Sequence, residues 1–481
     1  MNDHFQRECR IEIPQRGYGR VDSILFQDES DYVTLVIDLI GADWLDNHKK
    51  NFSKLLSNKI NPLNDAPLFR LEVNLSATGP WFGENIQSGK RVKLPKRLLS
   101  KTEGRWVELQ LEEVVGIGES NALIYKSLYS APLPVISTGT FVSSTKAKEL
   151  SKTFSLKNLP KIDENEIIKY VEMVNAEYLA VYDVGQGNAN ALLNEYLIPE
   201  MYFDLGAAVY GNQKTAPKNL VFCFTNNPAI ILSHWDADHW AGTYATMVGK
   251  TYPAMNRTWI APLQKVGAIQ LAFAWDVITN GGAFLIYAPS PGSVNSFALS
   301  TTRIMKVGIG AGSDRNNTGI VVTVENEIQP QNFRSWLLTG DCEYKYFYTR
   351  FCLAPPIGIV APHHGAKLHG GSVAPQPIKT DVYKRLVYSF GPNNRHGCTG
   401  VRHPTLEGIN AHTGWDHGKW GSVSIGDVQP GGDVIATSEH SSTSRGSVLV
   451  GWGPIKWSGP IIPPCVKTGH INTCSSLFNY F

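Results

Sequence analysis

The six residues from His234 to His239 include two histidines and two aspartates, Asp236 and Asp238, and they directly follow an apolar run at 230–232. Side chains on an extended chain alternate between faces, so His234, Asp236 and Asp238 are expected to project to one side. His239 joins them once the chain turns. The alternative, a polar loop with ordinary histidines, fits this spacing poorly. The segment therefore predicts a metal site.

Four further segments each end an expected strand in a residue that can bind a metal or orient a ligand. Asp183 stands in the first, Asp204 in the second and Asp341 in the third, while His363 and His364 are neighbours in the fourth. Loops at strand ends can aim such side chains into one cleft. The segments are 181–188, 202–206, 337–341 and 359–365.

This succession of motifs resembles the metallo-β-lactamase fold superfamily. The Asp-Val-Gly-Gln-Gly opening, Asp236 in the middle motif and the Pro-His-His-Gly ending look most similar to the hydrolase domain of the ComEC/Rec2 competence proteins. The resemblance covers about residues 179–450. It implies an α/β fold, an αββα sandwich with a two-metal cleft along one edge of the sheets.

The resemblance also implies a role for each motif residue. Asp341 would bridge two divalent ions, Zn²⁺ or Mn²⁺, because a carboxylate has two oxygens. Asp183 and Asp204 would orient the ligands, and only one of the two adjacent histidines is expected to ligate directly. The metal-ligand candidates are His234, Asp236, Asp238, His239, Asp341, His363 and His364.

Two departures from the family pattern bear on the metal. Many members have His where this chain has Asp236, and no His occurs from Trp240 to Gly340. Carboxylate-rich ligation favours a harder ion, so Mn²⁺ becomes as plausible as Zn²⁺. In addition, Asn188 replaces the Asp that is usual in the competence group.

Residues downstream supply candidates for the reaction and for substrate binding. Asp238 would orient the nucleophile, and His403 would ligate late or protonate the leaving oxygen. Asn394 and Arg395 could hold a phosphate, although a lone arginine is a weak signal. The remaining histidines of this region, His396, His412, His417 and His440, lie in Gly-rich stretches where ordinary surface histidines are expected.

The expected function is metal-dependent hydrolysis by a metal-activated water at a dinuclear site, with a phosphodiester or nucleic acid as the favoured substrate. One alternative is a hydrolase of small molecules, such as a lactone, a thioester or a cyclic nucleotide. Another is a degenerate site in a binding or regulatory protein. A net charge of +2 gives no global field for nucleic acid, so phosphate recognition would have to be local.

The chain of 481 residues is long enough for two or three domains. We expect a smaller, mostly β N-terminal module at 1–142 with one helix at 43–56, which is a possible protein-partner module. A Lys- and Ser-rich linker at 143–176, the hydrolase domain at 177–455 and a tail at 456–481 would follow.

The remaining composition points to an ordinary cytoplasmic protein. No run of about 18 apolar residues appears that could span a bilayer, and the N-terminus lacks the apolar core of a signal peptide. Seven scattered cysteines favour reduced thiols. A metal clip or disulfide at Cys465, His470 and Cys474 is the weaker interpretation, and the basic cluster 90–97 is expected to be a solvated strand edge rather than a phosphate site.

Overall fold

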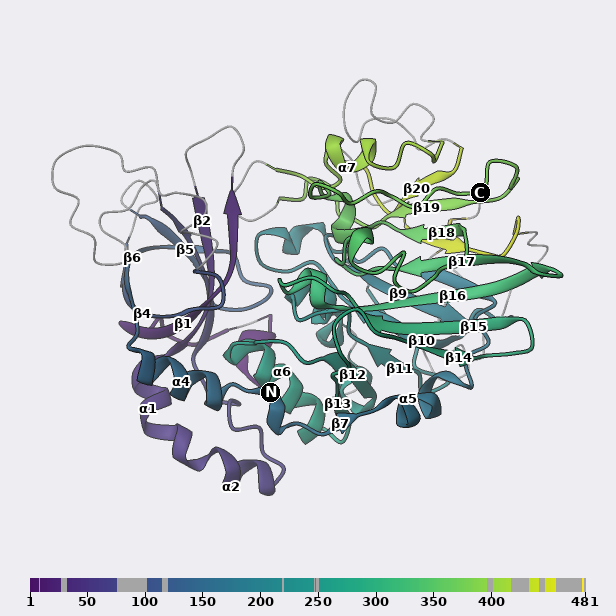
Figure 1. Cartoon of the computed structure of the whole chain (residues 1–481). Helices are drawn as coiled ribbons and strands as arrows, with labels where there is room; N and C mark the ends of the chain where they lie inside the picture. Colours follow the sequence, from purple (N-terminus) through teal and green to yellow (C-terminus); the bar gives the residue numbers. More distant parts are fainter. Residues whose placement is uncertain are drawn as a thin grey trace. The chain divides into compact units, whose positions relative to one another are not determined.

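The computed structural model describes residues 1–7, 9–26, 33–75, 102–114, 120–218, 220–245, 247, 251–395, 401–416, 432–440, 446–455 and 478–479. The chain divides into two compact units (Figure 1). Unit 1 comprises residues 1–158, 265–280 and 395–401, and unit 2 comprises the remainder. The basic cluster 90–97, His396, His417, Cys398 and the segment 465–474 lie outside the described residues.

Unit 1 is built on a closed six-stranded β-barrel with the strand order β1-β2-β3-β5-β6-β4. Its interior is filled by β-branched and aliphatic side chains such as Ile37, Leu71 and Val107, each fully buried. Closure pairs every strand on both sides and leaves no free edge. The strands are β1 (Arg16–Phe26), β2 (Val33–Gly41), β3 (Leu68–Asn74), β4 (Trp106–Glu113), β5 (Ala122–Tyr125) and β6 (Leu133–Phe141).

Short helices accompany the barrel. The expected helix at 43–56 is divided into α1 (Ala42–His48), the 3-10 turn η2 (Lys49–Asn51) and α2 (Phe52–Ser57). Helix α6 (Ala268–Thr279) comes from the middle of the chain and belongs to unit 1. Within this unit, Gln270 of α6 donates to Asp38 of β2 at 2.5 Å, and Asn61 donates to Asp276 at 2.8 Å.

Unit 2 contains two large sheets that share one apolar core. Met201 and Phe203 of the first sheet and Val322, Trp336 and Leu338 of the second are all fully buried in that core. The alternate residues of the second sheet, such as Leu337, face a separate cluster on its other side. This alternation with a period of two is the expected pattern for a sheet buried on both faces.

The first sheet has nine strands in the order β22-β21-β8-β9-β10-β11-β12-β13-β7, and the second has seven in the order β14-β15-β16-β17-β18-β19-β20 (Figure 1). The strands of the first sheet are β7 (Lys161–Ile162), β8 (Tyr178–Val181), β9 (Ala189–Leu193), β10 (Pro199–Leu205), β11 (Ala229–Ile231), β12 (Thr258–Pro262), β13 (Ala283–Tyr287), β21 (Ser447–Val450) and β22 (Phe478–Asn479). The strands of the second sheet are β14 (Val294–Ala298), β15 (Arg303–Ile309), β16 (Ile320–Gln329), β17 (Asn332–Leu338), β18 (Pro356–Val360), β19 (Arg385–Tyr388) and β20 (Val434–Ala436).

The expectation of an αββα sandwich is wrong. The structure is mostly β, with 32% strand and 22% helix, a closed six-stranded barrel and the two large sheets. The described stretches that follow β10, β11, β17 and β18 in unit 2 form short 3-10 turns, such as η7 (Ala237–His239) and η12 (Pro362–Gly365), where that fold would require covering helices. Glycine and proline are frequent in these stretches, and both disfavour helix interiors.

Residues 143–176, expected to be a linker, contain regular structure. Helix α4 (Ser144–Thr153) is capped by Ser143, whose side chain accepts the Lys146 N–H. Helix α5 (Glu164–Val171) begins with a capping box at Asp163 and buries Ile167 and Val171. The division between the two units falls at Asn158. Polar composition concealed these helices because their N-terminal caps and exposed faces are themselves polar.

The described residues bear on two expectations, that the cysteines are reduced and that no segment spans a bilayer. Cys9, Cys223, Cys342 and Cys352 are free thiols. Among the described residues, every helix is too short or too polar to cross a bilayer.

Candidate metal centre

The candidate metal ligands of unit 2 follow the carboxyl ends of parallel strands. His234 and His239 come after β11, and Asp341 comes after β17, while His363 and His364 come after β18. Parallel strands end at one edge of their sheet, and the loop after β11 of the first sheet meets the loops after β17 and β18 of the second. The spacing in the sequence therefore becomes a cluster in space.

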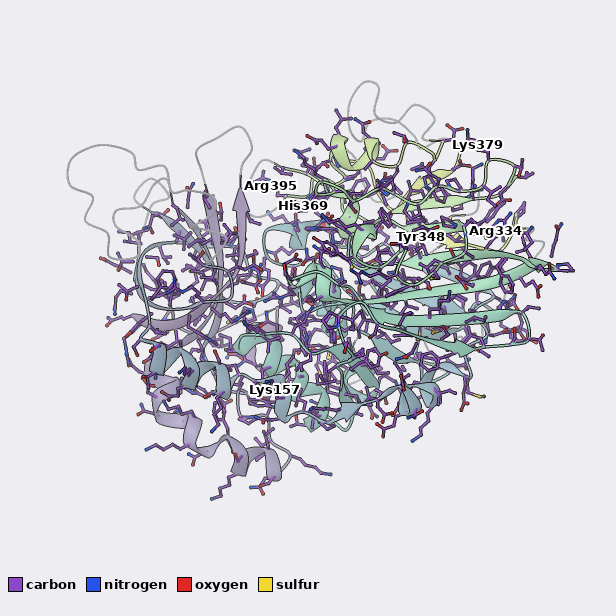
Figure 2. The ribbon with its side chains drawn as sticks, in the orientation of Figure 1. Lys157, Arg334, Tyr348, His369, Lys379 and Arg395 are labelled. Atoms are coloured by element: carbon purple, nitrogen blue, oxygen red, sulfur yellow. The ribbon has the colours of Figure 1, made fainter. Side chains whose placement is uncertain are left out.

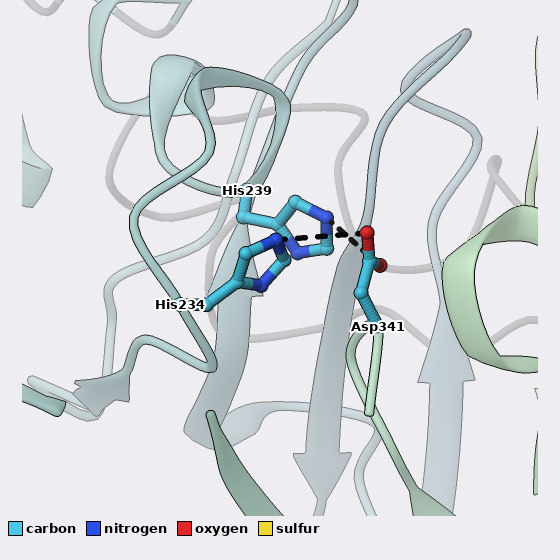
Figure 3. Close-up of side chains that lie close together, drawn as sticks. All are labelled: His234, His239 and Asp341. Carbon is cyan, nitrogen blue, oxygen red and sulfur yellow. Dashed lines mark ion pairs between the residues drawn. The ribbon is translucent and has the colours of Figure 1, made fainter. Parts of the chain in front are cut away.

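Three side chains form the buried part of this cluster (Figure 3). His239 Nε2 lies 3.2 Å from Asp341 Oδ1, and His234 Nε2 lies 3.6 Å from Asp341 Oδ2. Both Nε2 atoms and Asp341 Oδ1 are buried without a hydrogen-bond partner. Buried polar atoms are normally satisfied, and His234, His239 and Asp341 bring ligand atoms close enough together that they could hold one metal ion.

The outer part of the cluster adds two aspartates and two histidines. Asp236 Oδ2 lies 3.3 Å from His234 Nε2, and Asp238 Oδ2 lies 3.2 Å from His364 Nε2. His363 Nε2 lies 3.7 Å from Asp341 Oδ2.

The distances between these atoms fit ligands that share a cation. Atoms bound tetrahedrally at about 2.1 Å are about 3.4 Å apart, close to the spacings of the cluster. The contacts divide into two sets joined by Asp341, whose Oδ2 faces one set and whose Oδ1 faces the other. The first set is His234, Asp236, His363 and Asp341 Oδ2, and the second is Asp238, His239, His364 and Asp341 Oδ1.

Hydrogen bonds to Nδ1 orient three of the histidines. His239 Nδ1 donates to Asp204 Oδ2 at 2.8 Å, His234 Nδ1 donates to Ser233 Oγ at 2.9 Å, and His364 Nδ1 donates to the Ser389 carbonyl at 2.8 Å. In the neutral form, with its one proton on Nδ1, each ring would present the lone pair of Nε2 to the cluster. This is the tautomer that a metal ligand requires.

The carboxylate of Asp204 holds the rings of this cluster in place, although the Asp204 backbone is strained. It is fully buried with φ of 61°, and it accepts the Ser233 N–H at 2.6 Å and the Ser233 hydroxyl at 2.8 Å. Asn188 donates to the same carboxylate at 3.2 Å. A left-handed conformation in a non-glycine residue is costly and persists where surrounding contacts enforce it. Ser233 was not identified from the sequence, although it directly precedes His234.

Charge in the cluster is balanced between carboxylates and imidazoles. Burial favours a neutral His239 ring, but Asp341, Asp204 and Asp238 outweigh it and raise the pKa of His239 well above its ordinary value. Burial also disfavours the Asp341 carboxylate, yet His363, His239 and His234 hold its pKa well below the usual range. A set of carboxylates that requires protonated imidazole for balance is suited to a divalent cation.

Both histidines of the Pro-His-His-Gly segment face the cluster, whereas the sequence predicted that one would. His363 and His364 have φ of 49° and 56°, so both are in the left-handed region, and Gly365 follows with φ of 82°. The expectation assumed an extended chain, in which neighbours point to opposite faces. Consecutive left-handed residues coil the backbone and remove that alternation.

Of the other predicted site residues, His403 lies beside a metal-ligand candidate, and Asp183 lies in the turn after β8. His403 is buried, and its ring centroid is 5.2 Å from that of His363. Asp183 lies in the turn after β8, where its carboxylate accepts the Gly185 N–H at 3.1 Å. The Asp183 N–H also donates to the Ser447 hydroxyl at 3.0 Å.

Asn394 supports the backbone of His403, contrary to the expected contact with phosphate. Its Oδ1 accepts the His403 N–H at 2.9 Å, and its Nδ2 donates to the His403 carbonyl at 2.7 Å. The side-chain amide is committed to the protein and is buried. Arg395 is exposed and falls in unit 1 (Figure 2).

Two histidines expected to be surface residues are buried in hydrogen-bond networks. His412 is fully buried between the hydroxyls of Tyr344 at 2.8 Å and Tyr388 at 3.1 Å. His440 Nε2 donates to the His403 carbonyl at 2.8 Å. Loop composition alone does not reveal burial.

Comparison with known proteins adds no assignment. No family model matches the chain, and no curated protein matches it significantly.

Proposed function

We propose that the chain is a metal-dependent hydrolase that cleaves phosphodiester bonds at a dinuclear centre, as the resemblance of its motifs to competence-type hydrolases suggests. The observation that carries the proposal is the convergence of the orphaned Nε2 atoms of His234 and His239 on Asp341. Two bound divalent ions would lower the pKa of water and neutralise charge on the phosphoryl oxygens. Zn²⁺ and Mn²⁺ both fit a set of two imidazoles and two carboxylates.

The residues of the chain would have separate roles in this proposal. Asp238 is about one quarter exposed, with a side-chain accessibility of 27%, so it can contact an attacking water. His403 stands beside His363 and would hold the proton for the leaving oxygen. Asp204 keeps His239 oriented.

Hydrolysis of bis-p-nitrophenyl phosphate by the full-length protein tests the proposal, after removal of bound metal and reloading with Mn²⁺ or Zn²⁺. We expect turnover by the loaded protein and a loss of at least 100-fold in Asp341→Ala and Asp238→Ala. Glu172→Gln, a change at an exposed carboxylate of unit 2, is the control and should be unaffected. Single-stranded DNA, duplex DNA and RNA then identify the natural class. A loaded wild-type protein that cleaves none of these substrates would exclude the proposal.

A further inference from the structure

One guanidinium reaches the metal-ligand cluster, and the motifs did not point to it. Arg315 Nη1 donates to Asp236 Oδ1 at 2.6 Å, while Asp236 Oδ2 lies 3.3 Å from His234 Nε2. The carboxylate of Asp236 thus has one oxygen toward the cluster and the other toward Arg315. Arg315 lies about 80 residues further along the chain, so local spacing gave no signal for it.

The Arg315 side chain is only 9% exposed, but it contacts the side of the cluster that solvent reaches. The side chains of Asp236 and His363 are each 32% exposed, whereas His234 and His239 are fully buried. Asn316, the next residue, places its Nδ2 3.5 Å from Nδ1 of His363. The pair 315–316 therefore contacts both of the more exposed members of the first ligand set, where a substrate would approach.

The loop that carries Arg315 is held in place by hydrogen bonds. Gln264 donates to the Arg315 carbonyl at 2.7 Å, and the Asn317 N–H donates to Asp314 at 2.9 Å. Just after the loop, the Ile320 N–H donates to the carbonyl of Ser233 at 2.7 Å. The guanidinium is consequently fixed relative to His234, and binding at this position would require little ordering.

Arg315 differs from the other described lysines and arginines in its ion pair with an aspartate of the cluster. Of the lysines and arginines that the structure describes, it is the only one in an ion pair with Asp204, Asp236, Asp238 or Asp341. A guanidinium presents five N–H donors in one plane, a geometry that matches both carboxylates and phosphates.

We propose that Arg315 is the anion-recognition residue of this centre and binds a non-bridging phosphate oxygen of the substrate, with Asp236 holding the guanidinium in position. The choice of a phosphate ester rests on the proposed function. The competing explanation is that Arg315 only neutralises Asp236 and supports the first ligand set. The two explanations differ in whether phosphate affinity can be lost while metal is retained.

Binding of inorganic phosphate to the metal-loaded, full-length protein tests this role without requiring turnover. We expect Arg315→Met to weaken phosphate binding at least tenfold in calorimetric titration, with metal content unchanged by elemental analysis. Arg315→Lys keeps the positive charge but loses the planar fork, so it should fall between wild type and Arg315→Met. Unchanged phosphate affinity in Arg315→Met would overturn the inference, and so would parallel loss of metal and phosphate.

Arg334→Met is the matched control. Arg334 is also a buried arginine paired with a carboxylate, since its Nε donates to Asp381 at 2.6 Å. It lies on β17, four residues before the strand ends at Leu338 and therefore about 13 Å from the end that precedes Asp341 (Figure 2). Its loss should not change phosphate affinity. If Arg315→Met does not fold, Arg315→Lys decides the question, because wild-type affinity in that variant contradicts the proposal.

The result separates this inference from the proposed function. Phosphate binding that depends on Arg315 in a protein that cleaves no diester would support the inference and remove the proposed function. Cleavage of diesters with the same KM and the same phosphate affinity in Arg315→Met would do the reverse.

Discussion

Orientation of single side chains is what makes the cluster suitable for metal. His239 could rotate about its side-chain bonds, but the bond from Nδ1 to Asp204 fixes both its tautomer and the direction of Nε2. Acceptors in this outer position typically contribute 10- to 100-fold to metal affinity. The role of Asp204 can therefore be separated from that of the ligands.

Replacing Asp204 by Asn should lower metal affinity by about 10- to 100-fold, because an amide cannot both accept from His239 and keep the Ser233 contacts. Competition with a chromophoric chelator measures the change. Asp381→Asn is the control, since that carboxylate of unit 2 accepts from Arg334 at 2.6 and 2.9 Å and should leave the affinity nearly unaltered. Equal losses in both variants would show that the cluster responds to general destabilisation.

A buried histidine in unit 1 should make stability depend on pH. Burial, opposed by hydrogen bonds to the carbonyls of Lys126 and Leu68, lowers the pKa of His4 from 6.5 to about 4. Between these values the unfolded chain takes up a proton that the folded chain does not. The free energy of unfolding therefore falls as pH decreases through this window, by up to about 1.4 kcal/mol per pH unit from this group.

The His4→Asn variant tests this dependence, because it removes the titrating group and keeps an N–H donor. We expect the slope of unfolding free energy against pH, measured by urea denaturation between pH 4 and 6.5, to be smaller in the variant. The two slopes should coincide above pH 7. Parallel curves over the whole range would contradict the depressed pKa.

At the level of residues, the sequence predicted the chemical types of the cluster but not all of its contacts. His234 to His239 are neighbours in the chain, so their convergence needs only a strand end and one turn. The ion pair of Asp236 with Arg315 and the amide of Asn394 beneath His403 depend on where distant loops pack. Spacing along the chain carries no information about such contacts.

At the scale of elements, the turn after β10 packs its backbone closely against the loop that contains Asp238. The turn after β10 passes so near to the loop that a Cβ on Gly206 would lie 1.8 Å from the Asp238 carbonyl oxygen and 2.4 Å from that of Asn188. The Asn188 N–H also donates to the Asp238 carbonyl at 3.1 Å. Glycine at 206 is thus required for the position of Asp238.

Gly206→Ala should displace this loop, lower metal affinity at least tenfold and reduce stability by about 1–3 kcal/mol, as overpacking usually does. Metal titration and urea denaturation give the two quantities. Gly370→Ala is the matched control, because a Cβ there has no atom within 4 Å. Wild-type metal affinity in Gly206→Ala would mean that the loop tolerates displacement.

Secondary-structure elements were predicted where neighbouring residues carry a clear apolar pattern, and they were missed where no such pattern was recognised. Strands β3 and β4 lie in the N-terminal segment that was expected to be mostly β, and their apolar residues are close neighbours in the chain. The 3-10 turns of unit 2 lack a helical apolar repeat, and α4 and α5 are short helices in a polar stretch, so composition suggested a different structure. In α5 the buried residues Ile167 and Val171 do stand at helical spacing, a signal that was missed. The wrong αββα expectation came from motif order, which specifies strand ends but not what covers the sheets.

At the scale of the whole molecule, the two compact units are not continuous segments of the chain. Helix α6 lies between segments of unit 2 in the sequence, yet Gln270 binds Asp38 and Asn61 binds Asp276 within unit 1. A shortened chain that starts near Glu166 would lack these partners and expose the helix. The proposed hydrolysis should accordingly be measured on the full chain, and variants are preferable to truncation.

Removal of metal should loosen unit 2 selectively. All the metal-ligand candidates belong to unit 2, and binding to the folded form alone stabilises it by about 4 kcal/mol when free ion is 1,000-fold above Kd. After chelation we expect faster amide hydrogen exchange in β11 and β17 of unit 2 and unchanged exchange in β2 and β3 of the barrel. Asp341→Ala, already without its bridging carboxylate, should show no response to the chelator. Equal acceleration in the barrel and the sheets would mean that the two units unfold as one, and no acceleration in either would mean that the cluster holds no ion.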